Sequence, residues 1–195
     1  MPHPLLDRVA TYITLAENEA QEFLQAFTEN QVAKGEYLLQ PGKVCQHIHF
    51  IAEGLVRHYH ADEAGQEITC DFTPEGRFLT DLMSLRSGEP SQYAFIALES
   101  THYYSIPRGP LEQLYAKYPA METMGRQITE ETALRISHQA QAFITQKAED
   151  RYRNFVRQQP ELVQRVPQKY VAAYLGIKPE SLSRIRKQMM DAEKP

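Results

Sequence analysis

The sequence has little cysteine and no long apolar run, and both absences narrow the classes of protein to which it can belong. Its two cysteines, Cys45 and Cys70, are too few for a disulfide framework or for an all-cysteine iron–sulfur cluster within one chain. No segment approaches the ~20 consecutive apolar residues of a membrane-spanning helix. The N-terminus lacks the basic start and apolar stretch of a secretion signal. We therefore expect a cytoplasmic protein with no membrane partner.

The sequence motifs of catalysis are also missing. There is no Gly-x-Ser-x-Gly nucleophile elbow, no glycine-rich phosphate-binding loop, and no arrangement of Cys and His that suggests a nucleophile. Acidic residues are scattered, as expected of a chain with a formal net charge of −4. We expect no enzyme activity, and the sequence neither requires nor identifies a cofactor.

Positive charge is concentrated at the C-terminal end of the chain. Residues 146–195 carry eleven lysines and arginines against six acidic residues, a formal charge of +5. The other 145 residues carry ten basic and nineteen acidic residues, a formal charge of −9. Such an asymmetry is expected when one end of a chain binds a polyanion and the rest of the chain does not bind it. A solvated basic face is the alternative interpretation.

The pattern of apolar residues changes twice along the chain. Residues 5–30 predict helix, because apolar side chains recur there at steps of three and four. Residues 31–107 contain regularly spaced turn glycines: Gly35, Gly42, Gly54, Gly65, Gly76 and Gly88. Short β-type runs lie between them: His47–Ile51, Leu55–His60, Ile68–Phe72, Tyr93–Leu98 and Thr101–Ile106. This texture predicts an antiparallel sandwich or roll, with a hairpin loop at Asp62–Gly65.

A long helix is predicted after the strands. Small, polar and apolar residues form a mixed stripe at steps of three and four: Met121, Gly125, Ile128, Thr132, Ile136, Ala140 and Phe143. Because no proline occurs between positions 120 and 159, a single helix of about 25 residues is plausible. The stripe has no obvious partner helix within the chain, which favours pairing with a second copy. Packing against the preceding β-rich region of the same chain is the alternative.

Residues 167–189 predict two short helices joined by a tight turn. Their apolar positions form one face on each helix: Val171, Ala172 and Leu175, then Leu182 and Ile185. Gly176 is suited to end the first helix, because glycine adopts the left-handed conformation at little cost. Pro179 fits the first position of the second helix, where a missing N–H is no loss. This arrangement is a helix-turn-helix, with a simple packing hairpin as the alternative.

The outward face of the second helix carries the side chains expected to touch DNA. Its predicted major-groove residues are Glu180, Ser181, Ser183, Arg184 and Lys187. Arg184 can donate two hydrogen bonds to a guanine edge, and Glu180 can accept one from a cytosine amino group. A further set is suited to contacts with DNA phosphates: Lys169, Lys178, Arg186 and Lys187. Such contacts position the protein on the duplex but do not determine which base sequence it binds.

These residues resemble those of a known family. The tract 174–187, with Glu180-x-x-Ser183-Arg184 inside it, is similar to the recognition unit of the CRP/FNR-family regulators. Pro41-Gly42, Ile48–Gly54 and Gly76-Arg-Phe resemble that family's cyclic-nucleotide-binding-type β-roll. The helix at about 118–145 corresponds to its dimerisation helix.

The resemblance implies an α+β fold in three parts. Residues 1–117 would form an antiparallel β-roll (a cyclic-nucleotide-binding-like jelly roll) acting as sensor, 118–145 a long dimerisation helix, and 146–195 a helix-turn-helix domain. It also implies a homodimer on pseudo-palindromic double-stranded DNA, with RNA polymerase as a further partner. Two departures are expected: Lys178 stands where Ser or Thr would cap the helix, and little room is left before Pro195 for a β-hairpin wing.

The sensor positions depart from the family pattern as well. In cyclic-nucleotide-binding members, a Gly-Glu pair holds the ribose and an Arg-Ser pair holds the cyclic phosphate. Alignment on Gly76-Arg-Phe places Thr80-Asp81 and Ser91-Gln92 at these positions. Asp81 keeps a carboxylate, but the phosphate arginine is missing, so the anion would lose its strongest contact.

Arg77 and Arg86 are the alternative phosphate ligands, although nothing in the sequence places either beside these positions. Haem is bound by some members of the family, but no residue is singled out here as its axial ligand. We therefore expect an effector of unknown identity, other than cyclic AMP.

Four histidines form a second candidate site. His47-x-His49 and His58-x-His60 fall on two successive predicted strands, with Glu53 nearby in sequence. Imidazoles meeting across a hairpin could bind a transition metal in a cupin-like manner. The residues that alternate with them look core-facing, however: Ile48, Phe50 and Tyr59. Solvent-facing histidines without metal are therefore the favoured interpretation.

Two function classes follow from these observations. The first is a dimeric, sequence-specific DNA-binding transcription regulator of the CRP/FNR type. The alternative is a small-molecule or metal-binding, cupin-like sensor module in which the C-terminal helices are structural and do not touch DNA.

Overall fold

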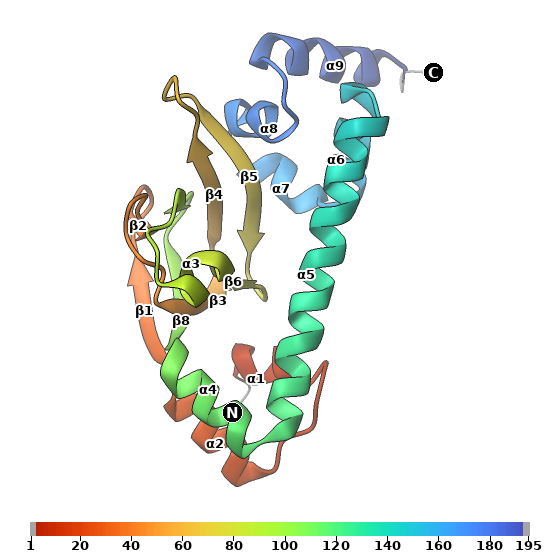
Figure 1. Cartoon of the computed structure of the whole chain (residues 1–195). Helices are drawn as coiled ribbons and strands as arrows, with labels where there is room; N and C mark the ends of the chain where they lie inside the picture. The colour runs from red at the N-terminus through yellow and green to blue at the C-terminus, as the bar shows by residue number, and fades with distance from the viewer. Residues whose placement is uncertain (1–2, 193–195) are drawn as a thin grey trace. The chain divides into compact units, whose positions relative to one another are not determined.

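The computed structural model of the chain describes residues 3–192 (Figure 1). Two helices come first, α1 (Pro4–Val9) and α2 (Glu17–Gln25). The strands are β1 (Thr28–Val32), β2 (Tyr37–Leu39), β3 (His47–Glu53), β4 (Leu55–Ala61), β5 (Glu67–Pro74), β6 (Phe78–Leu79), β7 (Tyr93–Ala97) and β8 (Thr101–Pro107), with α3 (Leu82–Ser87) after β6. The later helices are α4 (Arg108–Lys117), α5 (Pro119–Thr145), α6 (Ala148–Gln158), α7 (Pro160–Arg165), α8 (Gln168–Tyr174) and α9 (Pro179–Ala192).

The chain divides into two compact units. One contains the chain up to His58 together with Phe72–Ala133, and the other contains Tyr59–Asp71 and the chain from Leu134 onward. The hairpin of β4 and β5 and the long helix α5 therefore each contribute residues to both units.

The strands form two four-stranded sheets, with the orders β1-β8-β3-β6 and β2-β7-β4-β5. β3 pairs antiparallel with β6 and β8, β1 with β8, and β2 with β7. Successive strands such as β3 and β4 lie in different sheets, which is typical of a roll. The predicted antiparallel roll is confirmed, and each of the five predicted strands overlaps an observed one.

Gly54 is the residue at which the chain passes from one sheet to the other. Its φ of 102° lies in a region that L-residues rarely adopt. A Cβ at this position would lie 2.5 Å from Oγ1 of Thr101 and 2.8 Å from the Ser100 carbonyl oxygen. Only glycine therefore fits between β3 and β4.

The prediction of helix over residues 5–30 is confirmed for α1 and α2 but is wrong between them and at its end. Helices α1 and α2 are separate, and Thr28–Val32 forms β1. Thr28 lies opposite Ser105 in an antiparallel register that runs to Val32 opposite Thr101. This strand is mostly polar, so its pairing with β8, rather than an alternating apolar pattern, sets its conformation.

The first unit has two apolar clusters on opposite faces of β3. Phe50 packs with apolar residues of the helices: Leu5, Val9, Phe23, Leu111, Leu114, Met121 and Met124. Ile51, the next residue, packs inside the roll with Leu39, Cys45, Val56, Leu79 and Phe95. Neighbouring side chains of a strand point to opposite faces, so β3 is covered on both sides.

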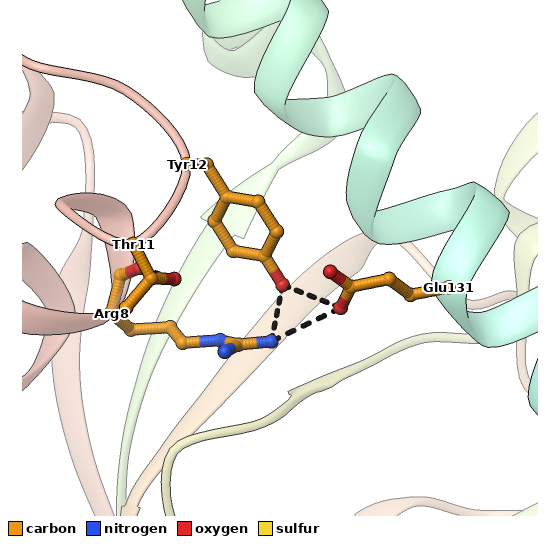
Figure 2. A network of polar contacts seen from close by, with 4 residues as sticks. All are labelled: Arg8, Thr11, Tyr12 and Glu131. Atoms are coloured by element: carbon orange, nitrogen blue, oxygen red, sulfur yellow. Dashed lines mark hydrogen bonds and ion pairs between the residues drawn. The ribbon is translucent and has the colours of Figure 1, made fainter.

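A polar network joins the segment after α1 to α5 (Figure 2). The Tyr12 hydroxyl donates to Oε2 of Glu131 at 2.7 Å, and Arg8 donates to both Tyr12 and Glu131. The Arg8 guanidinium also lies over the Tyr12 ring, 4.7 Å from its centroid. Burial, and then the hydrogen bond to Glu131, raise the pKa of Tyr12 to about 12. The phenol therefore stays protonated and keeps its role as donor at neutral pH.

The second unit joins the hairpin of β4 and β5 to the later part of α5. Arg135 forms an ion pair with Asp71, and Nε2 of Gln139 donates to the Cys70 carbonyl at 3.1 Å. The predicted long helix is confirmed, because α5 runs unbroken for 27 residues. Among residues 3–192, no helix is both long enough and apolar enough to cross a membrane.

Candidate nucleic-acid interface

The turn between α8 and α9 is built from a helix-ending glycine, as the sequence predicts. Gly176 has a φ of 67°, in the left-handed region. Its N–H donates to the Ala173 carbonyl at 3.2 Å, and the Ile177 N–H donates to the Ala172 carbonyl at 3.0 Å. These two bonds form a Schellman motif, which satisfies carbonyls at the end of α8 and redirects the chain. Pro179 then opens α9.

The apolar faces of α8 and α9 are buried as predicted. Their buried residues are Val171, Ala172, Leu175, Leu182 and Ile185. Helices α6 and α7 contribute further buried side chains to this unit: Tyr152, Phe155 and Leu162. The two short helices pack against each other, so the predicted helix-turn-helix geometry is present (Figure 1).

The polar residues predicted to touch DNA lie mainly on the exposed side of this unit. Those exposed to solvent are Lys169, Lys178, Glu180, Ser183, Arg184 and Lys187. Ser181 and Arg186 are half-buried, and the ammonium group of Lys169 lies 4.7 Å from the centre of the Tyr170 ring. Lys194, which contributes to the sequence's basic C-terminal charge, lies outside the described residues.

Glu180 and Arg184 have a spacing that suits a shared contact surface. Residues four apart on a helix lie on the same side, one turn apart. Within residues 3–192, no carboxylate forms an ion pair with Lys178, Arg184 or Lys187. Their charges are therefore available to an external anion.

Asp81, one of the predicted effector residues, is held by bonds within the protein. It is the N-cap of α3, and its Oδ1 accepts from the Met83 N–H at 3.1 Å and the Ser84 N–H at 3.2 Å. Its Oδ2 accepts from the Ser91 hydroxyl at 2.6 Å. Both carboxylate oxygens thus have structural partners, as expected of a capping aspartate.

The other predicted effector residues differ in their hydrogen bonding and exposure. Thr80 donates from Oγ1 to the His47 carbonyl at 3.0 Å, whereas Gln92 is exposed. Ser84, which sequence reasoning missed, accepts from the Cys45 N–H at 2.9 Å and donates to the Glu89 carbonyl at 2.6 Å. A capping Asp followed by Gly88 at the end of α3 was the signal that could have predicted this short helix.

The arginines offered as phosphate ligands do not join this group. Arg86 is exposed, and Arg77 is half-buried. Within residues 3–192, neither side chain forms an ion pair or a hydrogen bond with Asp81 or Ser91. The network around Asp81 therefore holds α3 by means of neutral donors alone.

The histidine prediction is wrong in two respects. The strands that carry the two pairs, β3 and β4, lie in different sheets rather than in one hairpin. His49 does not face solvent: it is 6% exposed, because the roll interior covers the face of β3 opposite Phe50. Its ring stacks on His47 and meets the Tyr103 ring edge-on. Burial, and then the neighbouring His47, lower the pKa of His49 to about 4.

The remaining histidines do not complete a metal site. His58 lies edge-on against Tyr93 and Phe95, with ring centroids 4.6 Å and 4.9 Å apart, and His60 is half-buried. The described chain contains no group of three or more His, Cys, Asp or Glu side chains arranged to hold a metal ion. The four histidines therefore do not form the metal-binding cluster that the cupin-like alternative predicts.

Comparison with known proteins identifies a family that matches the roll and solved structures that share the fold. Residues 29–118 match the family "Cyclic nucleotide-binding domain". A search of curated protein sequences finds no match. Among solved structures, FixK2 from Bradyrhizobium japonicum is 20% identical, with a TM-score of 0.72, and the match covers 85% of each chain.

Two further solved structures agree with this assignment. CLP of Xanthomonas campestris, a c-di-GMP responsive global regulator, is 15% identical over 91% of this chain and 93% of its own, with a TM-score of 0.71. A crp/fnr-family transcriptional regulator from Eubacterium rectale is 14% identical over 93% of this chain and 88% of its own, also with a TM-score of 0.71. Residues 29–118 therefore match a cyclic nucleotide-binding domain, and the chain has the fold of the CRP/FNR-family regulators.

Proposed function

We propose that this protein is a dimeric, sequence-specific DNA-binding transcription regulator whose effector is not cyclic AMP. The observation that carries the proposal is the two-sided character of α9. Leu182 and Ile185 are buried on one side, while Glu180, Ser183 and Arg184 are exposed on the other. A helix that follows a tight turn and presents such a face can enter the major groove of DNA.

The exposed residues divide by the part of DNA they suit. Arg184 is placed to read a guanine edge, and Glu180, one turn earlier, to accept from a cytosine amino group. Lys169, Lys178 and Lys187 are suited to phosphates, with the half-buried Arg186 at the edge of the surface. The local excess of basic residues supplies the attraction that an overall acidic chain would otherwise lack.

The later part of α5 supports the homodimer. Ile136 is 55% exposed and Ile144 is 86% exposed, and Leu134 is exposed with them. Apolar residues on one helix without cover in their own chain favour a partner of the same sequence, since most soluble oligomers are symmetric. RNA polymerase as a partner stays a prediction of the family resemblance.

The bonds of Asp81 argue against cyclic AMP as effector. A ribose hydroxyl would have to share the carboxylate with the Ser91 hydroxyl and the two α3 amides, which already donate to it. The cyclic phosphate would also lack an arginine partner at Ser91-Gln92. The effector, or its absence, is left open by the proposal.

Selection from a randomised DNA pool tests the function directly. The purified protein, without added ligand, is expected to enrich a two-fold symmetric site with half-sites about one helical turn (~34 Å) apart. The matched control is the Arg184→Ala variant, which should enrich a site with one less-defined position in each half. Absence of enrichment, both alone and with cell extract and metal ions added, would contradict the proposal.

A further inference from the structure

One arginine joins the helix-turn-helix to the end of α5. Nη1 of Arg151, on α6, donates to the Gln146 carbonyl at 2.7 Å, one residue beyond α5. Its Nη2 donates to the Leu175 carbonyl at 2.7 Å, at the end of α8. The guanidinium also lies over the Phe143 ring of α5, 4.7 Å from its centroid. All of these residues belong to the second unit.

The same ring also lies close to the turn itself. A Cβ on Gly176 would lie 3.1 Å from Cε1 of Phe143, so the turn leaves little space above the ring. The side-chain amide of Asn154 donates to Oε1 of Gln146 at 3.0 Å, which fixes the residue that follows α5. We refer to Phe143, Gln146, Arg151, Leu175 and Gly176 as the Arg151 junction.

The chemistry of the junction suits arginine in particular. The Gln146 and Leu175 carbonyls lie at the C-terminal ends of two helices, where the carbonyls carry partial negative charge and lack partners within the helix. A planar guanidinium can donate to both at once and stack on an aromatic face, whereas an ammonium cannot match this geometry. One cation therefore links the end of α5 directly to the turn, in addition to the covalent path through α6 and α7.

We propose that Arg151 is a positioning residue that sets the half-site spacing recognised by the dimer. The inference rests on the proposed function and deepens it. If α5 pairs two copies, the distance and angle between the two α9 helices depend on how each turn is fixed to its α5. The Arg151 junction is the direct connection between the two, so it selects one spacing out of the several that a loose connection would allow.

Arg151 contributes a positive charge as well as two directed hydrogen bonds and a stacking contact. The experiment must separate the effect of the charge from the effect of these contacts. Arg151→Lys keeps the charge but loses the second donor nitrogen and the planar stacking group. Arg153→Ala is the matched control, because Arg153 lies on the same helix but pairs with Glu149 on an exposed surface. The control removes a charge from α6 without touching the turn.

The probes are DNA duplexes of three kinds. The first carries the selected site, the second carries the same half-sites with one or two base pairs added or removed between them, and the third carries a single half-site. Each added base pair rotates one half-site by about 35° and moves it by about 3.4 Å. The wild-type protein and Arg153→Ala should prefer one spacing. Arg151→Lys should bind that spacing at least about tenfold more weakly, with a flattened spacing profile and an unchanged affinity for the single half-site.

The outcomes distinguish this inference from its premise. A variant that keeps the wild-type spacing profile overturns the positioning role. A variant that loses single half-site binding also overturns it, because Arg151 would then maintain the fold of the domain rather than its position. Wild-type binding without any spacing preference also overturns the positioning role alone. Failure of the wild-type protein to select a DNA site overturns the proposed function, and with it this inference.

Discussion

Replacing Asp81 with alanine separates a structural carboxylate from one kept for a ligand. The substitution removes the acceptor of the Met83 and Ser84 amides at the start of α3, which costs about 1 kcal/mol for a helix cap. It also leaves the buried Ser91 hydroxyl without its 2.6 Å acceptor, for about 1–2 kcal/mol more. We expect a total loss of about 2–3 kcal/mol of unfolding free energy, without any effector present.

Urea denaturation followed by circular dichroism measures this loss, as a fall of about 1 M in the unfolding midpoint. Amide hydrogen exchange adds a local measurement, because the Met83 and Ser84 N–H groups should lose protection first. Gln92→Ala is the matched control: Gln92 is exposed and stands next to Ser91, so its replacement should leave the midpoint unchanged.

The reasoning would be refuted by an Asp81→Ala protein with the wild-type midpoint and wild-type exchange at α3. Such a result would mean that the carboxylate contributes nothing to the ligand-free fold. Ser91→Ala provides a second check, since it removes one of the three bonds and should lower the midpoint by less than Asp81→Ala does.

The DNA surface, the dimer and the roll interior each give a further prediction. Arg184→Ala should cost about 1–3 kcal/mol of binding and relax the preference at one base position. Lys187→Ala should instead weaken binding to all sequences and reduce its salt dependence, both measured by fluorescence anisotropy in a salt series. Ile136→Asp should shift the protein to monomer in analytical ultracentrifugation, because a charge replaces an exposed apolar contact. The lowered pKa of His49, about 4 against 6.5, means that the unfolded chain binds the proton more tightly. Stability should therefore be complete above pH 6.5 and fall as the pH drops towards 4, a trend that His49→Phe should reduce.

Each of these predictions has an opposing result. An Arg184→Ala protein with unchanged base preference would mean that the exposed face of α9 does not read DNA. An Ile136→Asp protein that stays dimeric would place the interface elsewhere. Equal pH dependence of the urea midpoint between pH 5 and 7 in wild type and His49→Phe would show that this imidazole does not control it.

The strongest parts of the sequence prediction depended on residues whose conformation is set locally. Gly176 and Pro179 fix the end of one helix and the start of the next by their own backbone preferences. The unbroken α5 follows from the absence of proline after its first residue, Pro119. Features of this kind need no knowledge of the rest of the chain.

The errors fall where distant segments decide the structure. The polar sequence of β1 gives no alternating pattern, and only its partner β8 makes it a strand. The burial of His49 could not be read from β3, because helices cover one face of that strand and the roll covers the other. The effector role of Asp81 stays a prediction, and its bonds to α3 and Ser91 could not be read from the sequence, because Ser91 lies ten residues away.

The partnership of β1 with β8 also determines when the roll can form during synthesis. Nδ2 of Asn30 on β1 donates to Oγ of Ser105 on β8, a residue 75 positions later in the chain. Pairing over such a separation closes a long loop before any contact energy is gained, which slows folding. On the ribosome, β1 therefore emerges long before its partner strand. The roll is completed only after β8 has left the exit tunnel, while the local turn between α8 and α9 can form as soon as its own residues appear.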